Sequence, residues 1–200
     1  MSKKNKNFST KAIHVGQNPE KLYGAVSLPI YLTSTFKQEE FGEYEYDYSR
    51  AGNPTRTNLE ENIASLENGK GAVAFSSGMG AISAVIHLLS AGDEVIFTRN
   101  VYGGTYRIME KIYKNFSINS HWVDTTNLEV LEKTISKKTK MIYIETPTNP
   151  MMEICDINAI SKISKKYNCI LVVDNTFMSP YNQRPIELGA DIVMHSITKY

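Results

Sequence analysis

Residues 169–174 read Cys-Ile-Leu-Val-Val-Asp (CILVVD) and form the most strand-like run of the chain, because four aliphatic residues stand together and end at a carboxylate. The other short apolar runs are residues 72–76, 94–98, 141–145 and 192–195. The segments with apolar side chains at helical spacing are residues 78–89, 106–113, 128–135 and 157–167. Buried strands that alternate with amphipathic helices are typical of a mostly parallel sheet flanked by helices on both faces. The sequence therefore predicts an α/β fold.

The start of the chain has a different character. Residues 12–56 show no sustained period of either 2 or 3.6, and residues 41–50 (FGEYEYDYSR) are polar and aromatic at once. Such a segment cannot form a core by itself. We therefore expect residues 1–56 to be an extended N-terminal arm that packs against this domain or a second subunit, and residues 57–200 to form the large domain. The first eleven residues carry four lysines and are expected to be solvated.

A further helix is expected where the arm ends. Asn53 and Pro54 resemble an N-cap followed by proline at the first helical position, and Gly69 is a helix-ending residue. Leu59, Ile63 and Leu66 then fall on one face.

The composition is that of a globular protein of nearly balanced charge. Of the 200 residues 42% are hydrophobic, and 22 Lys and Arg stand against 21 Asp and Glu, for a net charge of +1. These values exclude a disordered or collagen-like chain. A net charge this close to zero also provides no general electrostatic attraction to nucleic acid or to an anionic membrane surface. The longest aliphatic run, residues 170–173, is too short to span a bilayer. Cys155 and Cys169 are far apart and lack clustered histidines, which predicts free thiols, no metal and a cytoplasmic protein.

The candidate chemistry lies just after the strands, because ligands bind outside the carboxyl ends of the strands in such sheets. Ser77, Gly78 and Met79 open a helix, where backbone N–H groups and the helix dipole favour a phosphate. A tight turn also uses glycine for geometric reasons alone. The G-x-G-x-x-G spacing of a dinucleotide fold and the G-K-[ST] of a Walker loop are absent.

Three more polar side chains follow strands. Tyr102 stands beside two glycines, where it could cover a ring or simply close over the sheet edge, and the spacing alone favours the second interpretation. Asn149 lies in a turn between two prolines. Asp174 ends an aliphatic strand and is either a turn residue or the counter-ion of a bound cation, since a buried carboxylate is costly without a partner.

Lys199 follows the last predicted strand and two hydroxyl side chains, Ser196 and Thr198. A phosphate-binding turn, a buried carboxylate and a lysine at one sheet edge are the parts needed for pyridoxal phosphate. The lysine amine forms a Schiff base with this cofactor, and a carboxylate keeps the pyridine nitrogen protonated.

Seven stretches carry a resemblance to a known family. They are AVSLPIYLTSTF, YSRAGNPTR, SSGMGAI, VYGGTYR, ETPTNP, VVDNTFMSPY and GADIVMHSITKY, and they run the whole length of the chain. In order, spacing and number they resemble the Cys/Met-metabolism family of pyridoxal-phosphate enzymes. The resemblance implies the fold type I of these enzymes, which is aspartate aminotransferase-like.

The resemblance also implies roles for individual residues. Lys199 is similar to the lysine that forms the aldimine with the cofactor and shuttles protons, and Asp174 to the partner of the pyridine nitrogen, with a low pKa beside that cation. Tyr102 is similar to the ring that stacks on the cofactor, which overturns the plainer interpretation. Tyr48 and Arg50 resemble a pair that reaches the phosphate of the neighbouring subunit. The further cofactor-binding residues implied are Ser77, Gly78, Met79, Asn149, Thr176, Ser196 and Thr198.

The activity implied is trans-sulfuration of a small sulfur amino acid in a homodimer that builds a homotetramer. We expect a cystathionine γ-lyase, which gives cysteine, 2-oxobutyrate and ammonia, with cystathionine γ-synthase as the alternative. Methionine γ-lyases carry a cysteine where this chain has Gly104, which makes that activity less favoured. Family members continue well beyond the lysine that Lys199 resembles, into a domain whose arginine binds the substrate carboxylate. A truncated, inactive chain is therefore a third expectation.

Overall fold

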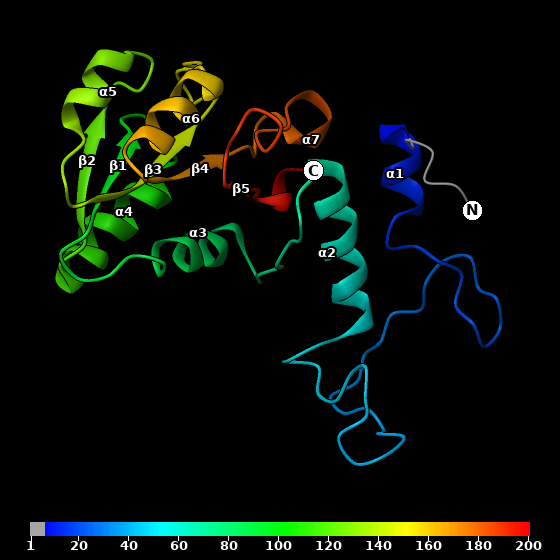
Figure 1. Cartoon of the computed structure of the whole chain (residues 1–200). Coiled ribbons are helices and arrows are strands. Elements are labelled where there is room, and N and C mark those ends of the chain that lie inside the picture. Colours follow the sequence, from blue (N-terminus) through cyan, green and yellow to red (C-terminus); the bar gives the residue numbers. More distant parts are fainter. Residues whose placement is uncertain (1–6) are drawn as a thin grey trace. The chain divides into compact units, whose positions relative to one another are not determined.

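The computed structural model describes residues 7–200, which form two compact units, one ending at Ala74 and the other spanning Phe75–Tyr200 (Figure 1). The second unit is built on one parallel sheet with the strand order β2-β1-β3-β4-β5. The strands are β1 (Glu94–Thr98), β2 (Asn119–Val123), β3 (Thr139–Glu145), β4 (Ile170–Asp174) and β5 (Ile192–Met194). Strands β1, β3 and β4 are mostly apolar and almost wholly buried, as expected for the middle of a covered parallel sheet.

Helices cover both faces of this sheet (Figure 1). The helices of the second unit are α3 (Gly78–Ile86), α4 (Gly103–Lys111), α5 (Leu128–Thr134), α6 (Ile157–Lys166) and the short α7 (Ser179–Asn182), with 3-10 turns η1 (Tyr113–Phe116) and η2 (Ile197–Lys199). Helices α3 and α4 pack through Ile82 and Met109 on one face, and α5 and α6 pack through Leu131 and Ile160 on the other. Because successive side chains of a strand point to opposite faces of the sheet, each strand contributes to the hydrophobic core on both faces.

The first unit holds two helices joined by a long irregular segment. Helix α2 (Pro54–Glu67) begins at Asn53, whose side chain accepts a hydrogen bond from the Thr55 N–H, and ends at Asn68 in a left-handed conformation. Helix α1 (Phe8–His14) is fastened to it by Asn62, whose Nδ2 donates to backbone carbonyls of α1 and its end.

Residues 15–53 form the irregular segment between these helices. The isolated bridge between Thr35 and Tyr48 is one of its few regular contacts. Leu32 and Phe41 are almost fully exposed. The lack of a buried core agrees with the missing periodicity of the sequence.

Most predicted elements of the second unit are confirmed within a few residues, but β2, the short helix α7 and the two 3-10 turns were not predicted, and one predicted strand is wrong. Strand β2, at the sheet edge, was not predicted, because its sequence NSHWV is mostly polar. The strand expected at residues 72–76 is wrong: the segment has no strand hydrogen bonds, and Val73 and Phe75 are exposed. It joins the two units instead of entering the sheet.

In the first unit, the solvated segment expected over residues 1–11 includes the start of helix α1, and residues 1–6 lie outside the described part. Helix α2 belongs to the same compact unit as the described part of the arm, and this unit ends at Ala74. The division into an arm over residues 1–56 and a large domain over residues 57–200 stays a prediction. Of the helices described between residues 7 and 200, none is long and apolar enough to cross a membrane.

Candidate functional site

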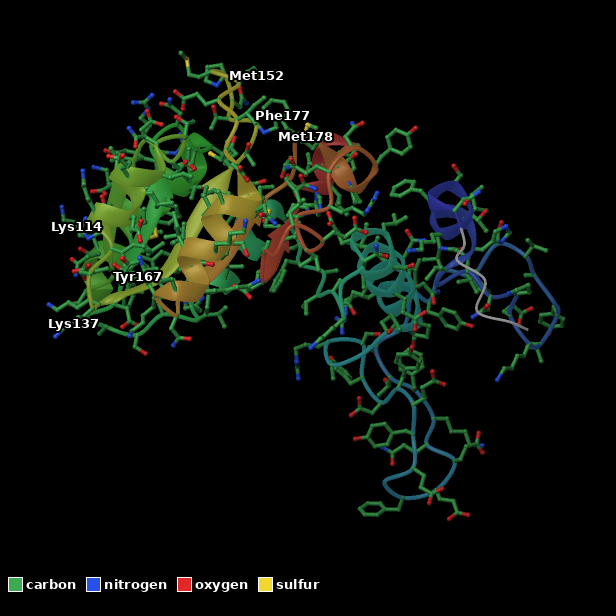
Figure 2. The ribbon with its side chains drawn as sticks, turned by 45° about the horizontal axis from the view of Figure 1, so that its top comes forward. Lys114, Lys137, Met152, Tyr167, Phe177 and Met178 are labelled. Atoms are coloured by element: carbon green, nitrogen blue, oxygen red, sulfur yellow. The ribbon has the colours of Figure 1, made fainter. Side chains whose placement is uncertain are left out.

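The predicted site residues of the second unit lie beyond the carboxyl ends of the parallel strands. Figure 2 shows Met152 after β3 and Phe177 and Met178 after β4 at one end of this unit, opposite Lys137 and Tyr167, which precede the same strands. Turns that follow β3, β4 and β5 therefore share one edge of the sheet. The predicted residues Asn149, Asp174, Thr176, Ser196, Thr198 and Lys199 lie in or next to these turns.

Helix α3 brings its first turn against the segment after β5. Ser77 is the N-cap, and its hydroxyl oxygen accepts a hydrogen bond from the Gly80 N–H at 3.1 Å. A Cβ added at Gly78 would lie 2.8 Å from the Cβ and 2.9 Å from the Oγ of Ser196. Gly78 is therefore required by the close approach of its backbone to Ser196, and the two predicted anion-binding segments are neighbours.

A chain of contacts leads from Ser196 to the buried carboxylate. The Ser196 N–H donates to Oγ1 of Thr176 at 2.9 Å, and the Thr176 N–H donates to Oδ1 of Asp174 at 3.1 Å. On the other side, the Tyr143 hydroxyl donates to Oδ2 of Asp174 at 3.4 Å. The turns after β4 and β5 are thus tied together around Asp174, which is 5% exposed.

Burial raises the pKa of Asp174, while hydrogen bonds from Thr176 and Tyr143 and the charge of His195 act in the lowering direction. The sequence predicts a low pKa, but that expectation assumed a cation beside the carboxylate. With only the protein's own side chains around it, desolvation of the charged form is the larger effect. A cationic group placed against Asp174 would remove this penalty, so the carboxylate fits a protonated pyridine nitrogen.

Tyr102 is the N-cap residue of α4, and the residue is 44% exposed. A Cβ added at Gly104 would clash with this ring and would lie 2.7 Å from Sδ of Met79. Tyr102 and Met79 therefore approach each other over Gly104, which connects the start of α4 with the start of α3. An exposed aromatic face beside two helix N-termini fits a flat, phosphorylated ligand.

Glu145 is a site residue that the sequence reasoning missed. It ends β3, it is 6% exposed, and the strand register places it beside Asp174. Its Oε2 accepts the Tyr102 N–H at 2.6 Å and its Oε1 accepts the Asn149 N–H at 3.2 Å. Burial and then the charge of Asp174 raise the pKa of Glu145 to about 7. The available signal was a carboxylate at the end of an apolar strand, the same pattern that singled out Asp174.

The remaining predicted residues are less closely joined. Thr198 and Lys199 lie in η2, directly after Ser196, and both are exposed. Tyr48 and Arg50 belong to the first unit, where the guanidinium carbon of Arg50 lies 5.0 Å from the centroid of the Tyr48 ring. Their predicted contact with a neighbouring subunit's phosphate stays a prediction. Within residues 7–200, no group of three or more His, Cys, Asp or Glu side chains is arranged to hold a metal ion.

A parallel sheet with helices on both faces, a glycine-opened helix and a buried carboxylate at its carboxyl edge agree with fold type I, the fold of the pyridoxal-phosphate enzymes that the sequence resembles. Comparison with known proteins gives the family. Residues 9–200 match the family described as Cys/Met metabolism PLP-dependent enzyme, so the chain belongs to this family, whose cofactor is pyridoxal phosphate.

Over the aligned region, individual relatives are about half identical to the chain. It is 52% identical over 192 residues to cystathionine gamma-lyase of Bacillus subtilis, covering 96% of this chain and 51% of the relative. It is also 52% identical over 194 residues to cystathionine beta-lyase of Lactococcus lactis subsp. cremoris, with 96% of this chain and 51% of the relative covered.

A solved structure is similar as well. The crystal structure of cystathionine gamma-lyase from Lactobacillus plantarum complexed with L-serine has a TM-score of 0.93 and 47% identity, and covers 95% of this chain and 50% of that chain. The chain therefore spans about half the length of the relatives it matches.

Proposed function

We propose that this chain supplies the cofactor-binding part of a pyridoxal-phosphate enzyme that acts on small sulfur amino acids, most specifically a cystathionine γ-lyase. The observation that carries the proposal is the run of contacts from Gly78 through Ser196 and Thr176 to Asp174. It joins a phosphate-binding helix start to a buried carboxylate at one edge of the sheet. A phosphorylated pyridine needs both groups, the helix start for its phosphate and the carboxylate for its ring nitrogen.

The residues fit the cofactor in chemistry as well as in place. Lys199 would hold it covalently through Nζ, Asp174 would pair with its ring nitrogen, and Tyr102 would cover its face. The groups that would bind its phosphate or its ring substituents are the backbone amides of Gly78 and Met79, the hydroxyls of Ser77, Thr176, Ser196 and Thr198, and the amide of Asn149. Since the Ser77 oxygen already accepts from Gly80, it would offer its hydroxyl proton to the phosphate.

When bound, pyridoxal phosphate supplies an electron sink for the negative charge left on a substrate carbon after a proton is removed. Asp174 would maintain this capacity, because its carboxylate would hold a proton on the ring nitrogen. Lys199 Nζ would remove and return protons at the substrate's Cα, as a positioned base next to the reacting atom. Tyr102 would orient the ring, and the first turn of α3 would anchor the phosphate through backbone N–H groups.

Two observations favour cystathionine γ-lyase over the other activities of the family. The stretches VYGGTYR, ETPTNP and VVDNTFMSPY are similar to those of γ-lyases. At Gly104 a side chain would clash with Tyr102, which is unfavourable to the cysteine that methionine γ-lyases carry there. Cystathionine γ-synthase uses the same cofactor chemistry to join cysteine to an activated homoserine, and stays the alternative. We further propose a homodimer that assembles into a homotetramer.

Two measurements test this function. Borohydride reduction of the protein with pyridoxal phosphate, followed by peptide mapping, should fix the pyridoxyl group on Lys199, and a label on another lysine would overturn the assignment. Product analysis with cystathionine should then give cysteine, 2-oxobutyrate and ammonia. Homocysteine and pyruvate would instead indicate cleavage on the other side of the sulfur, and turnover only with cysteine and an activated homoserine would indicate the synthase.

A further inference from the structure

Glu145 connects two segments that are distant in sequence. Its two carboxyl oxygens accept backbone hydrogen bonds from Tyr102, at the start of α4, and from Asn149, in the turn after β3. The 2.6 Å bond to the Tyr102 N–H is among the short ones expected for a charged acceptor. Both donors are backbone groups, so the carboxyl group fixes the course of the chain rather than the position of one side chain.

The location of this carboxyl group is unfavourable in itself. Glu145 is buried and stands beside the buried Asp174, so that desolvation and like charge both act against its ionised form. A buried carboxyl group is costly unless hydrogen bonds compensate for the lost water. At Glu145 the compensation comes from the two backbone N–H groups.

The start of α4 depends on this bond. Tyr102 is the N-cap residue of α4, and its own side chain makes no capping hydrogen bond to the helix. A carboxylate close to the N-terminus of a helix of nine residues is also favoured by the helix dipole. Glu145 thus stabilises the first turn of α4 from a neighbouring strand.

We propose that Glu145 is a positioning residue, a clamp that holds the start of α4 and the turn after β3 together so that Tyr102 and Asn149 keep their places beside Asp174. The proposal rests on the proposed function only in treating Tyr102 and Asn149 as cofactor contacts. The clamp itself is a property of the protein without cofactor. Its test therefore needs no turnover.

The first test is amide hydrogen exchange, measured by NMR on the cofactor-free protein with Glu145→Gln. A glutamine side chain keeps the size of Glu145 but offers one acceptor oxygen, so at least one of the two backbone N–H groups must lose its partner. We expect exchange at Tyr102 or Asn149 to become about tenfold faster, since hydrogen bonds to charged groups are among the stronger ones. Unchanged exchange at both amides in a folded variant would overturn the proposal.

The matched control is Glu132→Gln. Glu132 also accepts two hydrogen bonds, from Lys166 Nζ and the Tyr167 hydroxyl, but these come from the end of α6 and not from the site. This variant should leave exchange at Tyr102 and Asn149 unchanged. Faster exchange there in the control as well would show a general loosening of the unit and would also contradict the clamp.

A second measurement uses the unmodified protein, in case Glu145→Gln does not fold. The amide protons of Tyr102 and Asn149 should shift with the same midpoint as the carboxyl carbon of Glu145 when pH is varied. The other titrating groups around this carboxyl pair are Asp174 on β4, Tyr143 on β3 and His195 after β5. If the two amides follow Asp174 or His195 instead, the proposed clamp is wrong.

The cofactor gives the last readout. With Glu145→Gln we expect the dissociation constant of pyridoxal phosphate to rise about tenfold, while borohydride still labels Lys199. An unchanged dissociation constant would show that the clamp does not position the site. Absence of the label in the unmodified protein would contradict the proposed function but leave the amide results on the clamp intact.

Discussion

At the scale of single residues, the site is governed by two buried carboxyl groups on adjacent strands. Asp174 and Glu145 face each other through the register of β3 and β4, and burial raises the pKa of both. Their hydrogen-bond partners differ. Asp174 is tied to the turn that follows it through Thr176, whereas Glu145 accepts from the backbone of two other segments. Asp174 is accordingly suited to meet a ligand cation, and Glu145 to hold the protein around it.

Replacing Asp174 with asparagine should lower kcat by about a hundredfold, because an amide cannot keep the ring nitrogen protonated as a carboxylate does. The variant should not be less stable. The folded-state pKa of Asp174 is above the ordinary 3.8, so wild type loses stability as pH rises from that value through the folded-state pKa. Asparagine does not ionise, so the variant does not lose stability in this way as pH rises.

Urea unfolding at several pH values measures this effect. The stability of Asp174→Asn relative to wild type should increase from acid to neutral pH. Near-normal turnover would show that Asp174 is only a turn residue. Marked destabilisation of the variant at neutral pH would contradict the prediction that the buried charge of Asp174 costs stability.

At the scale of elements, helix starts determine the geometry of the site. Helices α3 and α4 each carry a glycine in the first turn that a close approach explains: the backbone of Gly78 meets Ser196, and Gly104 lies under the Tyr102 ring. Alanine is ordinarily the better helix former by nearly 1 kcal/mol. Here the space above each glycine is taken by a site residue, so helix propensity gives way to packing.

Substitution of the two neighbouring glycines of α4 should separate these effects. In Gly104→Ala the new methyl group must displace the Tyr102 ring, and we expect the dissociation constant of pyridoxal phosphate to rise about tenfold through lost stacking. In Gly103→Ala the methyl group would lie 3.5 Å from Nη1 of Arg107, an ordinary contact, and binding should be unchanged. Equal affinities of the two variants, measured by titration of the cofactor's absorbance, would exclude Tyr102 from the site.

At the scale of the whole molecule, the first unit exposes a large share of its apolar side chains. Leu32, Phe41 and Tyr23 are almost fully exposed, and the segment that carries them contributes no residue to the buried apolar core. Exposed apolar surface of this extent is typical of a protein–protein interface. The same segment carries Tyr48 and Arg50, which the resemblance to the family predicts to reach the phosphate of a neighbouring subunit.

Arg50 should therefore act across a subunit boundary. When an Arg50→Ala protein is mixed with a Lys199→Ala protein, mixed dimers contain one site with both residues intact, so about a quarter of the sites should regain activity after random exchange. Each variant alone should be nearly inactive. Native mass spectrometry shows whether mixed dimers form, and absence of recovery in their presence would place Arg50 in its own subunit's site.

The sequence by itself determined the parallel α/β sheet, because continuous aliphatic runs such as 170–173 and amphipathic segments such as 157–167 can be buried in few other ways. It also determined which turns carry polar groups, and hence Asp174 and the glycine-opened helix at Gly78. Strand β2 was missed, because the polar sequence at a sheet edge lacks the apolar run that marks the central strands.

The tertiary structure alone decided the contacts across these turns. The approach of Gly78 to Ser196 and the pairing of Glu145 with Asp174 join residues far apart along the chain. Residues 72–76 have the composition of a strand, yet they stay outside the sheet and exposed, since an apolar run becomes a strand only where a neighbouring strand accepts its hydrogen bonds. Periodicity describes which side chains share a face. Register and close approach depend on which elements become neighbours, and only packing in three dimensions sets that.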